Sequence, residues 1–252
     1  MSKKVTANQR SSSAATRRVV DAGQNVKSRC RVVVLISGRG SNLQAIIDAI
    51  HAGALPIELC AVISNRAHAD GLANARAAGV ESLVVDHRDF SDRESFDREL
   101  IGQIDRHRPD LVVLAGFMRV LGKEFIDHYA GRLINIHPSL LPAFPGLHTH
   151  ERALAAGVKE HGATVHFVTC EVDGGPIIVQ ARVSVRVDDT PQSLAHRVLM
   201  EEHRIYPLAI HWYAEGRLRL SEGKVLLDGR PAPINEELPH PVAQENSTGL
   251  KR

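Results

Sequence analysis

Apolar runs and amphipathic segments alternate along most of the chain, and this alternation predicts strands separated by helices. Runs rich in branched aliphatic residues predict strands at residues 31–37, 57–64, 82–86, 110–115 and 133–136. Apolar residues three and four positions apart predict helices at residues 41–52, 70–78, 93–107 and 122–128. Apolar strands joined by helical crossovers are typical of a parallel sheet covered on both faces. The predicted fold class is therefore α/β, with a doubly wound, mostly parallel sheet that binds its ligands at the carboxyl ends of the strands.

The pattern changes after about residue 160. Residues 164–169 and 177–186 flank a turn-rich loop and predict an antiparallel pair of strands. A long helix is expected at residues 190–214, with Pro191 near its start and Gly216 just beyond its end. Two short strands are expected around Leu218 and Val225. We therefore expect one Rossmann-like domain over residues 31–229, with an antiparallel C-terminal extension.

The net charge of +2 over 252 residues is unevenly distributed. Residues 1–30 hold seven basic residues and one acidic residue, a net charge of +6, so the other 222 residues carry −4. This basic head has few large apolar residues and is expected to be a disordered extension, although its composition also resembles an organelle transit peptide. Residues 230–252 are polar and rich in proline, which predicts a flexible tail. The mildly acidic body argues against a nucleic-acid partner bound through a broad basic face.

Two further features limit the class of protein. No apolar stretch reaches the roughly 18 residues of a transmembrane helix, so no membrane partner is expected. The three cysteines, Cys30, Cys60 and Cys170, are odd in number and far apart. This spacing excludes a CxxC zinc knuckle and argues against a disulfide framework, so we expect a protein of a reducing compartment, the cytoplasm.

Residues 37–42 read SGRGSN and connect the first predicted strand to the first helix. Glycines there permit a tight turn, and free N–H groups at a helix N-terminus bind anions. The segment matches neither a dinucleotide fingerprint, because Leu43 stands at the third glycine position, nor a P-loop, because no GKS or GKT follows. We expect Ser41 and Asn42 to cap the helix and the loop to hold a phosphomonoester, with a simple turn as the alternative.

Asn135 and His137 are two residues apart at the end of a predicted strand, so both side chains project to the same side. An amide that donates to a developing oxyanion, beside an imidazole that moves protons, suits a reaction at a carbonyl. Asp173 lies in the loop DGGP, which is by itself a typical turn. A carboxylate facing His137 would stabilise its imidazolium and fix its tautomer, but the sequence does not show that the two residues meet.

Five segments together resemble one known family: SGRGSNLQAI, LAGFMRVL, INIHPSLLPAFPGLHTH, HFVTCEVDGGPIIVQ and EEHRIYPL. The chain resembles the folate-dependent phosphoribosylglycinamide formyltransferases of purine biosynthesis, from about Arg31 to Gly229. The resemblance implies a transferase in which the amine of phosphoribosylglycinamide attacks the formyl carbon of 10-formyltetrahydrofolate directly. It implies small-molecule substrates only, a monomer or a homodimer, and no metal.

The resemblance also implies roles for individual residues. Asn135, His137 and Asp173 match the catalytic trio, and Arg93 matches a cation that meets the glutamate tail of the folate. Residues expected to bind phosphoribosylglycinamide are Gly40, Ser41 and Asn42, at the phosphate, and Glu202, at the ribose and glycinamide parts. Residues expected to bind the folate, besides Arg93 and Asn135, form two walls: Met118, Arg119, Val120 and Leu121 on one, and Thr169, Cys170, Glu171, Val172 and Asp173 on the other.

Other functions fit these residues less well. The alternative is a formyltetrahydrofolate hydrolase, although such an enzyme is expected to carry a folded N-terminal regulatory domain. A methionyl-tRNA formyltransferase would need a further C-terminal RNA-binding domain. The intact trio argues against a folate- or nucleotide-binding protein without activity, and Cys170 lacks an evident base that would make it a nucleophile. A zinc hydrolase is disfavoured because His148 and His150 are only two apart, with no HExxH motif.

Overall fold

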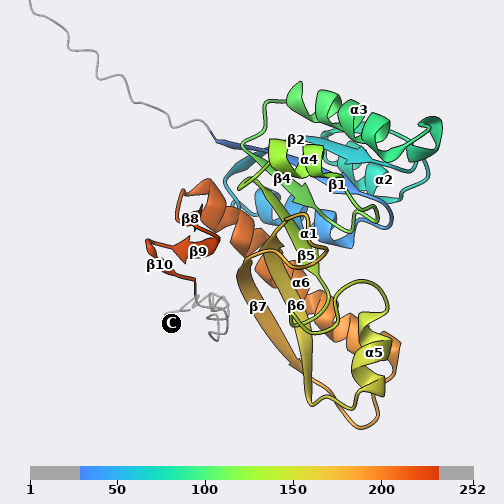
Figure 1. Ribbon diagram of the computed structural model, residues 1–252, viewed down its shortest axis with the longest axis vertical. Helices are drawn as coiled ribbons and strands as arrows, with labels where there is room; N and C mark the ends of the chain where they lie inside the picture. Colours follow the sequence, from blue (N-terminus) through green and yellow to red (C-terminus); the bar gives the residue numbers. More distant parts are fainter. Residues whose placement is uncertain (1–28, 233–252) are drawn as a thin grey trace, which may run out of the picture.

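The computed structural model describes residues 29–232, which fold around a seven-stranded sheet (Figure 1). The strand order is β3-β2-β1-β4-β5-β6-β7, and the first five strands in this order are parallel. The strands are β1 (Cys30–Ile36), β2 (Ile57–Ser64), β3 (Glu81–Val84), β4 (Leu111–Leu114), β5 (Leu133–His137), β6 (Glu160–Phe167) and β7 (Ile177–Ser184). Strand β6 runs antiparallel to β5, and β7 antiparallel to β6, so the predicted doubly wound sheet with an antiparallel extension is confirmed.

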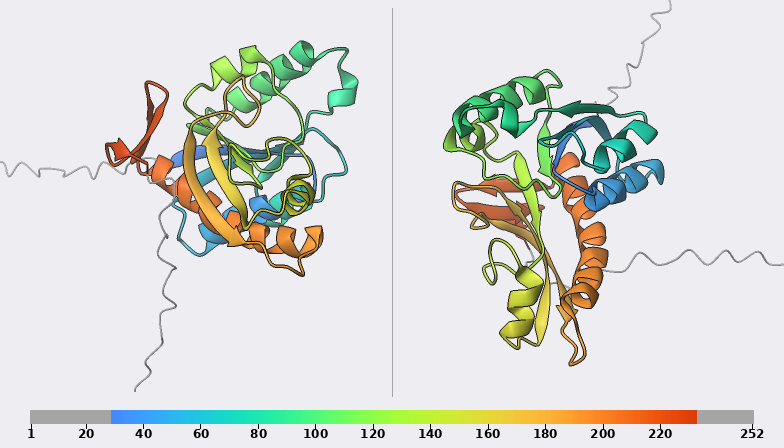
Figure 2. Two further views of the ribbon diagram at one scale, coloured as in Figure 1. Left: turned by 60° about the horizontal axis from the view of Figure 1, so that its bottom comes forward. Right: turned by 90° about the vertical axis from the view of Figure 1, so that its right-hand side faces the viewer.

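Helices cover both faces of the sheet. They are α1 (Ser41–His51), α2 (Gly71–Ala77), α3 (Arg93–Asp105), α4 (Lys123–His128), α5 (Thr149–Ala155) and α6 (Pro191–Ala214), with one 3₁₀ turn, η1 (His87–Asp89). Alternate residues of β1 enter two different cores: Val34 packs with α1, α2 and α6, whereas Val33 and Leu35 pack with α3 and α4. Figure 2 shows α3 and α4 on one side of the sheet and α1 and α6 on the other. No helix in the described range is long and apolar enough to cross a membrane.

Helix α6 ties the antiparallel strands to the parallel half of the sheet. Thr190 and Ser193 form a capping box at its start, with Pro191 in the first turn as predicted. Tyr206 is fully buried, and its hydroxyl donates to the carbonyl oxygens of Leu114 at 2.9 Å and Ile134 at 3.3 Å. Because these carbonyls belong to β4 and β5, the helix directly supports the strand that carries Asn135 and His137.

The structure differs from the predictions in three places. Helix α5 was not predicted, because its seven residues are too few for a clear apolar period. Strand β6 begins at Glu160, four residues before the predicted start, since His161 and Gly162 are buried without being apolar. Strands β8 (Leu218–Ser221) and β9 (Lys224–Leu227) are joined by β10 (Arg230–Pro231), which belongs to the segment expected to be a flexible tail. The predicted disorder of residues 1–28 and 233–252 concerns residues outside the described range.

Candidate functional site

Asn135 and His137 lie at the carboxyl end of β5, where the sheet changes from parallel to antiparallel. In the register with β6, Asn135 pairs with His166 and His137 with Thr164. His137 is only 6% exposed, whereas Asn135 is half-buried. The prediction that both residues share one strand end is confirmed, and β6 adds a second set of polar side chains beside them.

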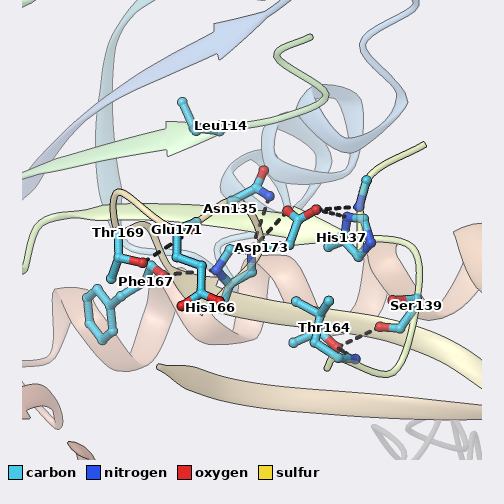
Figure 3. A network of polar contacts seen from close by, with 12 residues as sticks. Leu114, Asn135, His137, Ser139, Thr164, His166, Phe167, Thr169, Glu171 and Asp173 are labelled. Carbon is cyan, nitrogen blue, oxygen red and sulfur yellow. Dashed lines mark hydrogen bonds and ion pairs between the residues drawn. The ribbon is translucent and has the colours of Figure 1, made fainter. Parts of the chain in front are cut away.

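The loop after β6 brings Asp173 to His137, as Figure 3 shows. The Nδ1 atom of His137 lies 3.4 Å from Oδ2 of Asp173, and both side chains are largely buried. On the other side of the ring, Nε2 donates to the carbonyl oxygen of Phe144 at 2.9 Å. The same Asp173 oxygen accepts from the backbone N–H of Gly146 at 2.8 Å. Both ring nitrogens of His137 therefore face an oxygen acceptor, the Phe144 carbonyl at Nε2 and the Asp173 carboxylate at Nδ1.

Asp173 adopts a left-handed backbone conformation, with φ of 54°, as does Phe144, also with φ of 54°. Such a conformation is uncommon for residues other than glycine and costs of order 1 kcal/mol. The two loops that meet at His137 are therefore each bent sharply at the residue that contacts its ring. Strained residues of this kind concentrate at functional sites.

A second histidine, His166, completes the network and was not singled out from the sequence. Its Nδ1 lies 2.9 Å from the carbonyl oxygen of Phe167, and its Nε2 lies 3.2 Å from Nδ2 of Asn135. Burial lowers the pKa of His166, so the neutral ring is favoured, with the Nδ1 proton donated to Phe167. The unprotonated Nε2 of His166 then accepts a hydrogen bond from the Asn135 amide. This bond requires the Nδ2 group of Asn135, and not its Oδ1, to face His166.

Nε2 of His166 also lies 3.8 Å from Oδ1 of Asp173. The His166 ring therefore borders two members of the predicted trio, Asn135 and Asp173. The sequence signal for His166 is its place in the segment HFVTCEVD, where it precedes the Asp173 loop by seven residues.

Buried hydrogen bonds hold the loop that follows His137. Thr164 Oγ1 donates to the carbonyl of Ser139 at 2.6 Å and accepts from the backbone N–H of Leu141 at 3.1 Å. Gln180 Nε2 donates to the Leu141 carbonyl at 2.8 Å and to Thr164 Oγ1 at 2.9 Å. Since Thr164 and Gln180 belong to β6 and β7, the antiparallel part of the sheet fixes the base of the loop.

The predicted phosphate loop lies at the start of α1. Gly40 has φ of 73°, and a Cβ atom there would be 2.6 Å from the Cα of Gly71, so the turn requires glycine. The prediction that Ser41 and Asn42 cap the helix is wrong: the N-cap is Gly40, and no side chain makes a cap hydrogen bond. The first N–H groups of α1 therefore have no side-chain acceptor in the described range, which leaves them free for an anion.

The amide of Asn42 bonds instead to α6. Asn42 Nδ2 donates to Oε2 of Glu202 at 2.6 Å, although 160 residues separate the two. Burial raises the pKa of the Glu202 carboxyl, while the bond from Asn42 opposes this shift. Asn42 Oδ1 is buried without a partner among the described residues. The structure thus brings two predicted substrate residues together and leaves an acceptor beside them for a donor group.

The 118–121 segment is attached to the phosphate loop by one hydrogen bond, from the N–H of Met118 to Oγ of Ser37 at 2.7 Å. Met118 and Val120 are 62% and 53% exposed, unusual for large apolar residues, whereas Leu121 is buried. On the other predicted wall Val172 is 56% exposed, and Cys170 is an exposed free thiol. Exposed apolar side chains on both segments suit a flat, partly apolar ligand such as a pterin.

A buried carboxylate anchors the far end of this segment. Asp97 of α3 is 2% exposed, and its Oδ2 accepts from the backbone N–H of Gly122 at 2.6 Å. Burial raises the pKa of Asp97, while the bond from Gly122 and the charges of Arg93 and Arg119 oppose this shift. The guanidinium of Arg119 lies over the ring of Phe96, 5.2 Å from its centre. Arg93, the predicted partner of the folate tail, is exposed in the first turn of α3, beside Gly122.

No three His, Cys, Asp or Glu side chains between residues 29 and 232 are grouped so that they could hold a metal ion. His148 and His150 are not paired: His148 is largely exposed, and His150 contacts His161.

Comparisons with known proteins place this arrangement in a family. Residues 30–210 match the formyl transferase family. The chain belongs to that family. It is 55% identical over 202 residues to phosphoribosylglycinamide formyltransferase of Escherichia coli (strain K12), covering 80% of this chain and 95% of the relative.

Solved structures agree with this assignment. Phosphoribosylglycinamide formyltransferase of Coxiella burnetii superposes with a TM-score of 0.79 at 54% identity, covering 81% of this chain and 96% of that one. A formyltetrahydrofolate deformylase of Pseudomonas syringae gives a TM-score of 0.75 at 29% identity, covering 80% of this chain and 66% of that one. The predicted family and fold are confirmed, and the roles of the individual residues stay predictions.

Proposed function

We propose that this formyl transferase moves the formyl group of 10-formyltetrahydrofolate to the amine of phosphoribosylglycinamide, as a step of purine biosynthesis. The observation that carries the proposal is the joined arrangement of Asn135, His137 and Asp173 at one strand end. The Gly40 loop after β1, two strands away in the sheet and at the same edge of it, supplies a place for the substrate phosphate. The similarity to enzymes named phosphoribosylglycinamide formyltransferase supports the choice of acceptor.

The arrangement stabilises a tetrahedral intermediate. When the amine attacks the formyl carbon, the carbonyl oxygen becomes an oxyanion that can accept from Nδ2 of Asn135 and from Nε2 of His137. A hydrogen-bond donor of this kind contributes about 10²–10³ to the rate. Asp173 stabilises the imidazolium that makes the second bond. The carbon–nitrogen bond to the folate then breaks, and a water relays the proton from the attacking nitrogen to the leaving nitrogen.

His137 must change its hydrogen bond before it can act in this way. Its Nε2 donates to the Phe144 carbonyl at 2.9 Å, and one N–H cannot serve both that carbonyl and a substrate oxygen well. We therefore expect the loop around Phe144 to move away when both substrates are bound. Asp173 would follow part of this motion, because it accepts from Gly146 in the same loop.

The acceptor binds between α1 and α6. The free N–H groups at the start of α1 and the hydroxyl of Ser41 hold the phosphate. Asn42 Oδ1 and the Glu202 carboxyl offer acceptors for the hydroxyl or amide donors of the ribose and glycinamide parts. Pairing the buried Asn42 oxygen with substrate removes a desolvation cost of about 1–3 kcal/mol that the unbound site carries.

The function is tested by following formyl transfer from 10-formyltetrahydrofolate to three acceptors: phosphoribosylglycinamide, water and formyl-acceptor tRNA. We expect transfer to phosphoribosylglycinamide only. Transfer to water alone would support the alternative, a formyltetrahydrofolate hydrolase, and transfer to tRNA would refute the choice of acceptor.

The catalytic roles are tested by two variants whose folding is checked by circular dichroism. His137→Ala should lower kcat at least about 100-fold, since it removes one oxyanion donor. Asp173→Asn should lower kcat, because it removes the negative charge opposite the imidazolium while keeping a side chain of the same size. Turnover close to that of the unmodified enzyme would remove either residue from the trio.

We further propose a cytoplasmic enzyme that acts as a monomer or a homodimer and uses no metal. All three cysteines are free thiols, which suits a reducing compartment. Sedimentation of the purified enzyme would distinguish the two assembly states, and dialysis against a chelator should leave its activity unchanged.

A further inference from the structure

One buried hydroxyl, that of Ser37, joins the loop expected to hold the acceptor's phosphate to the segment expected to bind the donor's pterin. Ser37 directly follows β1 and is 3% exposed. Its Oγ accepts from the N–H of Met118 at 2.7 Å and donates to Oδ1 of Asn65 at 2.5 Å. Asn65 is also buried, at 2% exposed. Because the hydroxyl has a single proton, the bond to Asn65 leaves Ser37 as an acceptor toward Met118.

These hydrogen bonds cross the carboxyl edge of the sheet. Strand β1 lies between β2 and β4, and Asn65 and Met118 follow those two strands. The Asn65 carbonyl accepts in turn from Nδ1 of His87, in η1, at 2.9 Å. The turns that follow four neighbouring strands are thus linked by one chain of polar groups. Loss of the Ser37 hydroxyl would leave the Met118 N–H and the Asn65 oxygen without this partner.

The pterin segment depends on Ser37 because it has few other attachments. Residues 117–121 make no backbone–backbone hydrogen bond within the part of the chain that the structure describes. The segment is held at its two ends by side-chain acceptors, Ser37 at Met118 and Asp97 at Gly122. The position of Met118 and of the residues after it therefore depends on where the Ser37 hydroxyl lies.

The phosphate loop begins at the same residue. The N–H groups of Gly38, Arg39 and Gly40 make no backbone–backbone hydrogen bond within residues 29–232, and Gly38 and Arg39 are exposed. A phosphate bound at the start of α1 would order the turn between Ser37 and Gly40. Ser37 cannot itself donate to the phosphate, since its only proton is given to Asn65. Its effect on either substrate must therefore be indirect.

We propose that Ser37 is a positioning residue that couples the two substrate sites, so that each substrate tightens the binding of the other, an inference that rests on the proposed function. The phosphate orders the turn that begins at Ser37, and the Ser37 hydroxyl then holds the N–H of Met118 and with it the pterin segment. The donor meets a segment that is already ordered, so less conformational entropy is lost when it binds. The coupling is reciprocal, because it is a difference in binding free energy.

The test measures the Kd of tetrahydrofolate by isothermal titration calorimetry, with and without saturating phosphoribosylglycinamide. Tetrahydrofolate has no formyl group, so the two ligands do not react. We expect phosphoribosylglycinamide to tighten tetrahydrofolate binding to the unmodified enzyme by about fivefold or more. In Ser37→Ala the two Kd values should be equal. The reverse titration, of phosphoribosylglycinamide with and without tetrahydrofolate, should give the same factor in each protein.

A matched control is Ser64→Ala. Ser64 is a fully buried serine at the end of the neighbouring strand β2, and its Oγ bonds to the carbonyl and the N–H of Arg66, within its own turn. The control removes a buried hydroxyl at the same edge of the sheet that does not join the two substrate regions, so it should keep the coupling. A second variant, Asn65→Ala, leaves Ser37 in place but removes the acceptor that orients its hydroxyl, and it should lose part of the coupling.

Equal Kd values in the unmodified enzyme would overturn the proposal. A coupling that survives in Ser37→Ala would also overturn it, by assigning the coupling to direct contact between the two ligands. Loss of the coupling in Ser64→Ala would trace the effect to general loosening of the sheet edge and overturn it as well. Circular dichroism checks the folding of each variant, and if Ser37→Ala does not fold, unchanged coupling in Asn65→Ala overturns the proposal. Failure of the unmodified enzyme to bind either ligand would instead refute the proposed function.

Discussion

Burial of His161 should make the folded protein less stable at mildly acidic pH than at neutral pH. His161 belongs to β6, is 1% exposed, and lies edge-on against Phe144, the residue whose carbonyl bonds to His137. Its Nε2 is 3.2 Å from Nδ1 of His150, and its Nδ1 is buried without a partner in the described part of the chain. Burial, with smaller contributions from His150 and His137, lowers the pKa of His161 to about 4.

The lowered pKa sets the sign and the size of the effect. An unfolded histidine has a pKa near 6.5, so below that pH the unfolded chain binds a proton that the folded chain excludes. The free energy of unfolding therefore falls as the pH is lowered from about 6.5 towards 4. Between pH 8 and pH 5 the contribution of His161 amounts to about 2 kcal/mol. Burial also lowers the pKa of His166 and His203, so the enzyme as a whole loses more stability over this range.

The contribution of His161 is isolated by measuring urea unfolding at pH 8 and pH 5 for the enzyme and for His161→Gln. Glutamine keeps an amide donor for His150 but does not bind a proton in this pH range. The loss of stability between the two pH values should therefore be about 2 kcal/mol smaller for His161→Gln than for the unmodified enzyme. His196→Gln is the matched control: His196 is exposed on α6, and its replacement should leave the pH dependence unchanged. Identical pH dependence in the enzyme and His161→Gln would refute the reasoning.

Three further predictions follow from buried contacts around the site. Asp97→Ala removes the acceptor of the Gly122 N–H and should raise the KM of the folate donor about tenfold with kcat nearly unchanged, whereas Asp97→Asn, which keeps an acceptor, should restore most of the affinity. Tyr206→Phe should lower the free energy of unfolding by about 1 kcal/mol in urea titrations, since two carbonyls lose their donor. Gly40→Ala should raise the KM of phosphoribosylglycinamide and lower the melting temperature, because its Cβ would meet Gly71; unchanged values would show that the turn tolerates a side chain.

Most of the parallel half of the fold was predictable because its central strands are apolar on both faces. Every predicted strand from residue 31 to 136 overlaps an observed one. For β1, β4 and β5 this follows from burial on both faces, which demands an uninterrupted apolar run, whereas the edge strand β3 is only partly buried. Helix α5 and the start of β6 were missed for the opposite reason. Their buried positions include Thr149, His161 and Gly162, whose burial depends on tertiary contacts that no local period reveals.

The site was predictable only as separate pieces. That Asn135 and His137 share a strand end follows from the two-residue period of a strand. The contact of His137 with Asp173 depends on the antiparallel return of β6 and on a left-handed turn at Asp173 itself, where glycine is the usual residue. His166 was missed because its role arises from the register between β5 and β6, which sets its ring against Asn135.

Charge explains how a mildly acidic domain can bind two anionic substrates. The 222 residues after the basic head carry −4, so no general positive field attracts the phosphate or the folate. Attraction has to come from groups a few ångströms from each anion, where neighbouring acids and salt screen it least. The described domain supplies such groups in two forms: uncapped N–H groups at the start of α1, and unpaired arginines at 39 and 66. Both belong to turns at the carboxyl ends of β1 and β2. Anion binding by this domain therefore depends on such local groups, and not on the overall charge of the protein.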